Sequence, residues 1–254
     1  MKSLQIDLNS DMGEGFGAWK MGDDDAILDI VSSASVACGF HGGDPEIMAR
    51  VFAEAGRRGV AAGAHPGFPD LWGFGRRIIP FSLGEIERLV AYQIGAAIAL
   101  STYAANPITY VKAHGALGNL TQTDAGVATA IAKAIKAVDS SLICVTFAGG
   151  LMHPIANDLG LTTKAEVFAD RAYTEDGCLV HRSEPGAVLH DVEFAAQRML
   201  RMIQAGGIET TSGQMLPAHF DTICVHSDTP GAISMAAQVR RVLENAGVAI
   251  KPFK

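Results

Sequence analysis

Acidic and amide side chains begin inside the first strand-like segment of this 254-residue chain, in DLNSDMGEG at positions 7–15. Strand side chains alternate between two faces, so the apolar residues share one face while Asp7 and Asn9 share the other. Asp11 and Glu14 are expected on the loop beyond this strand. Carboxylates in such a position can bind a cation or act in acid–base catalysis. A solvated turn is the simpler interpretation, and the inward orientation of Asp7 and Asn9 argues against it.

Ionisable residues recur at the ends of later strand-like segments. In chain order they are His41 and Asp44, His65, Lys112 and His114, Glu166 and Asp170, and His226 and Asp228. Barrel enzymes build their active sites from several strand ends at one mouth, and burying unpaired charges together is costly. Plainer roles exist: Asp44 could cap a helix, and Glu166 could pair with Arg171 on the surface. The concentration of these residues at corresponding positions nevertheless predicts an active site.

The histidines that lie neither at a strand end nor near an acidic cluster are interpreted as hydrogen-bonded core residues: His153, His181, His190 and His219.

Two kinds of chemistry fit this cluster. A divalent metal held by Asp and His side chains would activate water, and the candidate ligands are Asp7, Asp11, His41 and His65. The same groups can instead act directly as general base and acid, and the absence of a compact motif such as HExxH favours this alternative. Lys112 is suited to stabilising a developing oxyanion. Arg76, Arg77 and Arg171 can bind carboxylates or phosphates, which fits a small acidic substrate.

Seven strand-like segments alternate with helical patterns along the chain. The expected strands are 4–9, 35–38, 60–65, 108–114, 142–147, 164–169 and 222–227, and the expected helices are 24–33, 45–58, 82–103, 124–138, 152–159, 192–205 and 231–246. This alternation predicts an α/β fold with a parallel sheet. A closed seven-stranded, TIM-barrel-like (β/α) barrel forming a single domain over 1–254 is favoured over an open doubly wound sheet. The segment 178–190, with 212–219, should form a small strand excursion before the last unit.

Composition narrows the class of protein. The net charge is −7, with no run of Lys or Arg, which excludes nucleic acid and anionic membranes as expected partners. No stretch reaches transmembrane length. The four scattered cysteines indicate reduced thiols in a cytoplasmic protein. A GxxxxGK[ST] phosphate loop is absent, so any nucleotide would bind without it or on another chain. Assembly into a homo-oligomer stays open.

Six blocks in order along the chain resemble the LamB/YcsF family of 5-oxoprolinase A subunits: DLNSDMGEGFGAW, ACGFHGGDP, GAHPGFPDLWGFGRR, VKAHGALGN, EVFADRAY and VHSDTPGA. The resemblance implies a distorted β/α barrel of the glycoside hydrolase/deacetylase kind. It also implies a hydrolase that opens the lactam of 5-oxoproline to give L-glutamate, coupled to ATP hydrolysis. The family's proteins act with partner subunits B and C, which would account for ATP use without a phosphate loop in this chain.

The resemblance assigns roles residue by residue. Asp7 or Asp11 would orient or deprotonate water, His41 and His65 would bind or shuttle protons, and Lys112 would bind the developing anion. The substrate-binding positions implied by the motifs are Asn9, Glu14, Asp44, His114, Asn119, Glu166, Asp170, Arg171, His226 and Asp228. The chain departs from the family pattern at three positions, which puts fine specificity in doubt: Ala113 for a usual proline, Gly118 for a usual tyrosine and Ser227 for a usual glycine.

Two rival functions stay open from the sequence. A metal-dependent deacetylase or amidase acting on carbohydrate or another small amide would use the same fold. A non-catalytic subunit that binds and delivers a small acidic molecule would use the same pocket. A requirement for ATP, the presence of a metal, and the activity of variants at Asp11 and His65 would separate the three functions.

Overall fold

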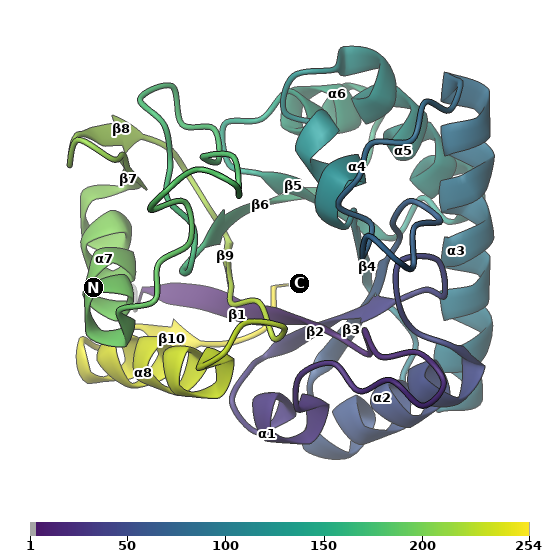
Figure 1. Ribbon diagram of the computed structural model, residues 1–254, viewed down its shortest axis with the longest axis horizontal. Helices are drawn as coiled ribbons and strands as arrows, with labels where there is room; N and C mark the ends of the chain where they lie inside the picture. The colour runs from purple at the N-terminus through teal and green to yellow at the C-terminus, as the bar shows by residue number, and fades with distance from the viewer. Residues whose placement is uncertain (1–3, 254) are drawn as a thin grey trace.

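Seven parallel strands close into a barrel in the computed structural model, which describes residues 4–253. Figure 1 shows the barrel nearly end-on, with its helices outside. The barrel strands, in order, are β1 (Gln5–Met12), β2 (Ser33–Ala37), β3 (Ala61–His65), β4 (Tyr110–Lys112), β5 (Ile143–Phe147), β6 (Thr163–Phe168) and β9 (Thr222–Cys224). Strand β9 pairs with both β6 and β1. This pairing confirms the predicted barrel and excludes the open sheet.

Helices cover the outside of the barrel and bury its outward-facing residues. They are α1 (Asp24–Leu28), α2 (Pro45–Arg58), α3 (Leu83–Tyr103), α5 (Ala125–Val138), α6 (Met152–Asp158), α7 (Val192–Ala205) and α8 (Ala232–Asn245). A further short helix, α4 (Gly115–Leu120), follows β4 at the barrel mouth, where the sequence pattern predicts none. Asp44 caps α2 through its carboxylate, as its position in the sequence indicates, and Asp124 caps α5 in the same way. Within residues 4–253, no helix has both the length and the apolar character needed to span a membrane.

Three short strands lie outside the closed ring. Strands β7 (Gly207–Glu209) and β8 (Met215–Pro217) form an antiparallel hairpin, and β10 (Ala249–Ile250) pairs with the start of β1. The expected strand excursion is thus confirmed at β8. The segment 178–190 forms no strand of that kind. It folds back as an irregular loop, held by isolated bridges of Arg171 with Val188 and of Tyr173 with Leu179.

Several predicted boundaries were wrong, and two of them move site residues. Strand β1 continues to Met12, so Asp11 lies within the strand, paired with Ser35 of β2, and not on the loop beyond. The end of β1 is polar, so the apolar pattern used to predict strands did not extend to the residues that pair with β2. Strand β4 ends at Lys112, and His114 is instead the residue before α4. Helix α1 likewise stops at Leu28, five residues before the predicted end, because β2 already begins at Ser33.

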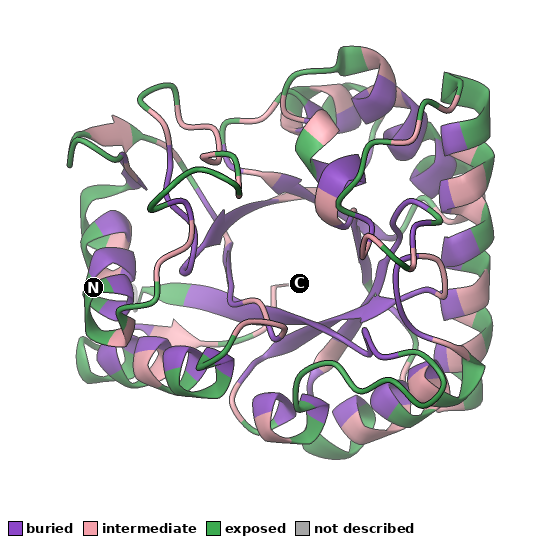
Figure 2. Cartoon of the chain, viewed as in Figure 1, coloured by how far each residue is buried: buried purple, intermediate pink, exposed green. Residues whose placement is uncertain are grey.

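The outward and inward faces of the barrel strands bury different types of side chain. Outward residues such as Leu8, Val36 and Ala64 belong to the apolar layer between strands and helices. The interior is largely polar, apart from a small apolar floor where Phe253 packs on Tyr110. Figure 2 shows that the strands are buried on both faces while the loops above the mouth are largely exposed. Charged groups in this interior must therefore be paired with one another.

Candidate active site

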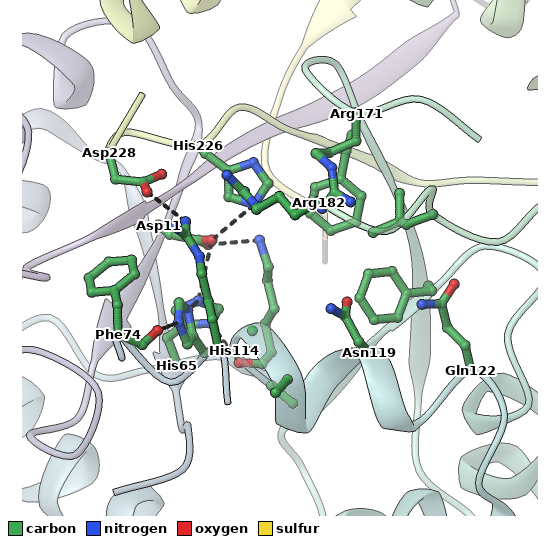
Figure 3. A pocket seen from close by; sticks show the side chains of 18 of the residues that line it. Asp11, His65, Phe74, His114, Asn119, Gln122, Arg171, Arg182, His226 and Asp228 are labelled. Atoms are coloured by element: carbon green, nitrogen blue, oxygen red, sulfur yellow. Dashed lines mark hydrogen bonds and ion pairs between the residues drawn. The ribbon is translucent and has the colours of Figure 1, made fainter. Parts of the chain in front are cut away.

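A cavity of about 340 Å³ opens at the carboxyl end of the barrel strands. This volume lies at the small end of the range of about 300–1,000 Å³ for small-molecule sites. Figure 3 shows side chains from opposite walls pointing into it. Of the predicted site residues, those that line the cavity are Asp11, Glu14, His65, Lys112, His114, Asn119, Arg171, His226 and Asp228. The barrel therefore brings together most of the predicted set, from loops and strands far apart in the chain.

Lys112 is the centre of the charge network beneath the cavity. Its Nζ donates to Asp11 Oδ1 at 2.7 Å and to Asn9 Oδ1 at 3.1 Å. Glu166 Oε1 lies 2.9 Å from the same nitrogen, and Cys224 Sγ lies 3.1 Å from it. Asn9 in turn donates to Glu166 at 2.9 Å. Every member of this network is buried, and all point inward, which confirms the strand-face prediction for Asn9, Lys112 and Glu166.

The network leaves Asp11 ionised and Lys112 charged. Burial by itself would raise the pKa of Asp11, but His65 and Lys112 outweigh it and hold the pKa well below its usual range. Burial opposes the charge on Lys112, and the anionic groups around it, Asp11 first, raise its pKa well above the ordinary value. Burial raises the pKa of Glu166 despite the nearby ammonium. One cation and one carboxylate are thus fixed at the cavity floor.

A cluster of three histidines and Glu14 forms one wall of the mouth. His65 Nε2 lies 3.0 Å from His114 Nδ1 and 3.3 Å from Asp11 Oδ2. Glu14 Oε1 lies 3.3 Å from both His41 Nε2 and His114 Nδ1. The rings of His41 and His114 stack with centroids 3.6 Å apart. Burial lowers the pKa of His41 and of His114, and the neighbouring imidazoles lower both further.

Glu14 differs sharply from Asp11 in its preferred protonation state. Burial raises the pKa of Glu14 well above its usual range, and the charges of Asp11 and Asp228 add to the effect. Two carboxyl groups whose pKa values are pushed in opposite directions are a frequent feature of catalytic sites.

Two groups of side chains have the types and spacing of metal ligands. Glu14, His41, His65 and His114 each present one ligand atom, and these atoms all lie within 4.8 Å of one another. Asp11, Cys224 and His226 form the second group. Of the predicted ligands Asp7, Asp11, His41 and His65, the two histidines share the first group and Asp11 Oδ2 lies 3.3 Å from His65 Nε2, whereas Asp7 lies at the other end of the barrel.

His226 and Asp170 form an oriented pair at the cavity edge. His226 Nδ1 lies 2.8 and 2.9 Å from the two carboxylate oxygens of Asp170, and its ring stacks on Phe168. Its Nε2 faces Asp11 Oδ2 at 4.0 Å. Burial would raise the pKa of Asp170, but His226 and two arginines lower it below the usual value. Asp170 itself does not line the main cavity and acts on it through His226.

Basic and amide side chains line the outer part of the cavity. Arg171 is buried and donates to the carbonyl oxygens of Ala187 and Val180. Within residues 4–253, no carboxylate lies within 4.0 Å of the guanidinium of Arg171 or Arg182. Figure 3 places both arginines across from Asn119 and Gln122. This outer end of the cavity is suited to an anionic group.

Asp7 points inward as predicted, but it does not lie near the mouth. It is on β1 two inward positions before Asp11, and it lines a separate hollow at the opposite end of the barrel. Its carboxylate accepts hydrogen bonds from Ser32, Ser33 and Thr222 at 2.5–2.7 Å. Burial raises its pKa to about 6. The geometry therefore removes Asp7 from direct contact with a molecule in the cavity and gives it a structural role.

Other predicted residues also lie away from the cavity. Asp44 accepts hydrogen bonds from the amides of Gly17, Glu46 and Ile47, which is the capping role. Asn9, Glu166 and His41 are buried behind the lining residues. Arg77 pairs with Asp70 away from the site, whereas Arg76 lines the cavity and pairs with Asp228 at 2.6 Å.

Sequence reasoning missed several lining residues. The interpretation of His181, His190 and His219 as core histidines is wrong, because all three are exposed. His181 lines the cavity beside Arg182. Phe74, Gln122, Phe147 and Phe168 also line it. Most of these positions lie in irregular segments with no strand periodicity. Strand parity was the available signal for Phe147, which shares a face of β5 with Ile143 and Val145, and for Phe168, which shares the inward face of β6 with Glu166.

The three departures from the family pattern have different settings. Ala113 lines the cavity, so the change from proline alters its wall. Gly118 lies in α4, where a Cβ would approach the carbonyl oxygen of Ala113 to 2.6 Å. Ser227 is buried, and its Oγ donates to the carbonyl oxygen of Asp11 at 2.6 Å. The serine thus adds a link between the β9 loop and β1.

The sequence match to a known family covers almost the whole chain: residues 6–254 match the LamB/YcsF family. The chain belongs to the LamB/YcsF family. A relative from Gluconobacter oxydans, named as the A subunit of 5-oxoprolinase, is 59% identical over 99% of each chain. The protein of the same name from Azorhizobium caulinodans is 58% identical over 98% of each chain. These relatives confirm the resemblance found in the motifs.

The family fold is also known from a solved structure. The lactam utilization protein from Thermus thermophilus is 44% identical to this chain and superposes with a TM-score of 0.93. The match covers 98% of this chain and 100% of that one. A more distant structure from Enterococcus faecalis, 11% identical with a TM-score of 0.57, shares only the fold.

Proposed function

We propose that this chain is the A component of an ATP-dependent 5-oxoprolinase and opens 5-oxoproline to L-glutamate. The observation that carries the proposal is the buried ion pair of Lys112 and Asp11 at the floor of a small cavity rimmed by arginines. This arrangement suits a small anionic amide whose carbonyl oxygen gains negative charge during reaction. The names of relatives up to 59% identical, and of a 44% identical lactam utilization protein, support the same substrate class.

The proposed chemistry begins with activation of a poor electrophile. Phosphoryl transfer from ATP to the lactam oxygen makes the ring carbon electrophilic. Water then adds to that carbon, the bond to the ring nitrogen breaks as the nitrogen gains a proton, and a second water hydrolyses the resulting acyl phosphate. Lys112 stabilises negative charge on oxygen during addition, because its ammonium is held in place by Asp11 and Glu166.

His226 is the best-placed base for the attacking water. Since Nδ1 donates to Asp170, Nε2 carries the lone pair and faces the cavity. Asp11, with its lowered pKa, is a weak base and orients water instead. Arg171 and Arg182 bind the substrate carboxylate at the other end of the cavity. The histidine cluster with Glu14 has the donors to hold a divalent metal, which would supply further polarisation of oxygen when bound.

The proposal includes partner subunits B and C. ATP would be bound and used with these partners, because this chain has no GxxxxGK[ST] phosphate loop. The complex would act in the cytoplasm, consistent with the four free cysteines.

The decisive experiment measures glutamate released from 5-oxoproline and ATP. This chain alone, subunits B and C alone, and all three together are compared. We expect turnover only from the full mixture, and loss of turnover when Lys112 is replaced by methionine in it. Full-mixture turnover that is absent, or unaffected by the replacement, contradicts the proposal.

A metal-dependent amidase is the second candidate, favoured by the cluster of Glu14 and three histidines. It predicts hydrolysis of a small amide by this chain alone, without ATP, and inactivation by a chelator. Release of acetate from N-acetylated sugars under those conditions would select this function over the first.

A further inference from the structure

Thr222 lies inside the barrel at the level where the closing strand β9 meets both of its neighbours. In the strand register it pairs with Asp7 of β1 on one side and with Glu166 of β6 on the other. Its side chain is fully buried and does not line the cavity. We propose that Thr222 is a positioning residue that holds the ammonium group of Lys112 in place through Asn9. The inference rests on the proposed function, because it concerns the oxyanion-stabilising role given there to Lys112.

A chain of hydrogen bonds links Thr222 to Lys112. Thr222 Oγ1 accepts from Asn9 Nδ2 at 2.7 Å, and Asn9 Oδ1 accepts from Lys112 Nζ at 3.1 Å. In the other direction, Thr222 Oγ1 donates to Asp7 Oδ2 at 2.5 Å. Asp7 lines the hollow at the opposite end of the barrel, whereas Lys112 lines the cavity. The chain therefore runs through the barrel interior from that hollow to the floor of the candidate active site.

The chemistry of the partners fixes the direction of each bond in this chain. An ammonium group only donates, so the carboxamide of Asn9 turns its oxygen toward Lys112. The amide nitrogen then faces Thr222 and Glu166 and donates to both. Because this nitrogen only donates, the Thr222 hydroxyl accepts from it and directs its own proton to Asp7. The orientation of the Asn9 carboxamide is thus set in part from the far end of the barrel.

The position of the Lys112 ammonium depends on the acceptors around it. Its three N–H groups face four of them: Asp11 Oδ1 at 2.7 Å, Glu166 Oε1 at 2.9 Å, and Asn9 Oδ1 and Cys224 Sγ at 3.1 Å each. The carboxylate oxygens accept in either orientation of their side chains. A carboxamide accepts only through its oxygen, so an inverted Asn9 would direct N–H groups at the ammonium and displace it.

The hydroxyl group of Thr222 opposes this inversion of Asn9. It is the nearer of the two acceptors of Asn9 Nδ2, at 2.7 Å against 2.9 Å for Glu166 Oε1. The Glu166 oxygen is also shared with Lys112 Nζ, so it does not serve the amide alone. Without the hydroxyl, an amide N–H of Asn9 is left buried and unpaired, which is costly. A shift of about 1 Å in a group that contacts the reacting oxygen can lower the rate about 100-fold.

Steady-state kinetics of the three-subunit mixture are the first test. Thr222→Val keeps the branched shape and removes the hydroxyl, so kcat for 5-oxoproline should fall about 10- to 100-fold. KM should stay within about twofold of wild type, because the arginines that bind the substrate carboxylate are untouched. Thr222→Ser restores the hydroxyl and should recover kcat to within about threefold of wild type. If Thr222→Val does not fold, Thr222→Ala takes its place with the same expected loss.

Thr210→Val is the matched control. Thr210 is a buried threonine outside the closed barrel, and its hydroxyl contacts Glu175 and Ser212. The replacement removes comparable hydrogen bonds without touching the chain from Asp7 to Lys112. It should therefore leave kcat unchanged, which separates the positioning of Lys112 from a general loss of stability.

The second test uses this chain alone and needs no turnover. Nitrogen-15 NMR of the lysine ammonium groups, with the Lys112 signal assigned by its loss in Lys112→Met, reports the surroundings of Lys112 Nζ. Thr222→Val should shift this signal and speed the exchange of its protons with water, whereas Thr222→Ser and Thr210→Val should not.

Three results would overturn the proposal. They are a kcat or a Lys112 signal that Thr222→Val leaves unchanged, an equal loss of kcat in Thr222→Val and Thr222→Ser, and an equal loss in Thr210→Val. Absence of turnover in the wild-type mixture contradicts the 5-oxoprolinase proposal instead. The NMR comparison then still tests the positioning of Lys112 by Thr222.

Discussion

Asp170 holds His226 by its Nδ1 at 2.8 Å, so that Nε2 of the histidine faces the cavity and Asp11. The two residues come from different strand ends, after β6 and after β9. A carboxylate behind an imidazole fixes the tautomer and stabilises the imidazolium that forms when the ring accepts a proton. The pair therefore suits proton transfer rather than simple contact with substrate.

Asp170→Asn should lower kcat without a comparable rise in KM. The amide would no longer fix the reactive tautomer, and we expect a loss of at least about 100-fold in the assembled enzyme. The double variant Asp170→Asn with His226→Ala should be no slower than His226→Ala alone, since the two residues act as a unit. Additive losses in steady-state kinetics would refute this coupling.

Lys112→Met should abolish most activity and also destabilise the fold. Loss of the oxyanion-stabilising charge is expected to reduce kcat by at least about 100-fold. Removing one partner of a buried ion pair costs about 3–5 kcal/mol, because Asp11 and Glu166 are left uncompensated. Lys164→Met, which breaks a partly exposed pair with Asp221, is the control and should cost less than about 1 kcal/mol. Steady-state kinetics and denaturant melts of both variants would show whether the loss of kcat is distinct from the loss of folding stability.

Arg182→Met should weaken binding of 5-oxoproline more than binding of its uncharged analogue 2-pyrrolidinone. A charge-assisted hydrogen bond contributes about 1.5–3 kcal/mol, which corresponds to a rise in KM of about 10- to 100-fold. Arg201→Met is a suitable control, because Arg201 pairs with Glu209 outside the cavity. A similar loss for both lactams would mean that Arg182 does not bind the carboxylate.

Ionisation of the buried Asp7 carboxyl group should lower the free energy of unfolding as the pH rises through the weakly acidic range. Its pKa is about 6 in the folded state and 3.8 without burial, so the folded state binds the proton more tightly. The stabilisation is complete below pH 3.8 and is lost as pH passes 6, a change of about 3 kcal/mol. Asp7→Asn should remove this component. Urea melts of both proteins from about pH 4 to about pH 7 provide the comparison, and a pH-independent difference would disprove it.

Asp44→Ala should reduce stability and leave catalysis unchanged. The carboxylate caps α2 and also accepts from Gly17, so its loss should cost about 1 kcal/mol. Because Asp44 does not line the cavity, kcat/KM for 5-oxoproline should stay within about twofold of wild type. A large rise in KM with unchanged melting would restore the substrate-binding role expected from the sequence.

Local chemistry allowed much of the fold and the site to be predicted from the sequence alone. Strand alternation placed Asn9, Lys112 and Glu166 inside the barrel, and the capping residue Asp44 placed the start of α2. Both signals depend on near neighbours in the chain, so they need no knowledge of the tertiary structure. The motifs of the LamB/YcsF family are likewise short contiguous blocks, so they can be recognised in the sequence alone.

The depth of each residue in the barrel was decided only by tertiary structure. The side chains of Asp7 and Asp11 both point into the barrel and differ in their position along its axis. Asp7 contacts hydroxyl groups, whereas Asp11 contacts Lys112. Their neighbours come from other strands, and strand stagger in the closed barrel sets which residues meet. The loop carrying His181 and Arg182 shows no periodicity, and it reaches the cavity only because the closed barrel places it there. Pairings across such distances leave no mark in the local sequence.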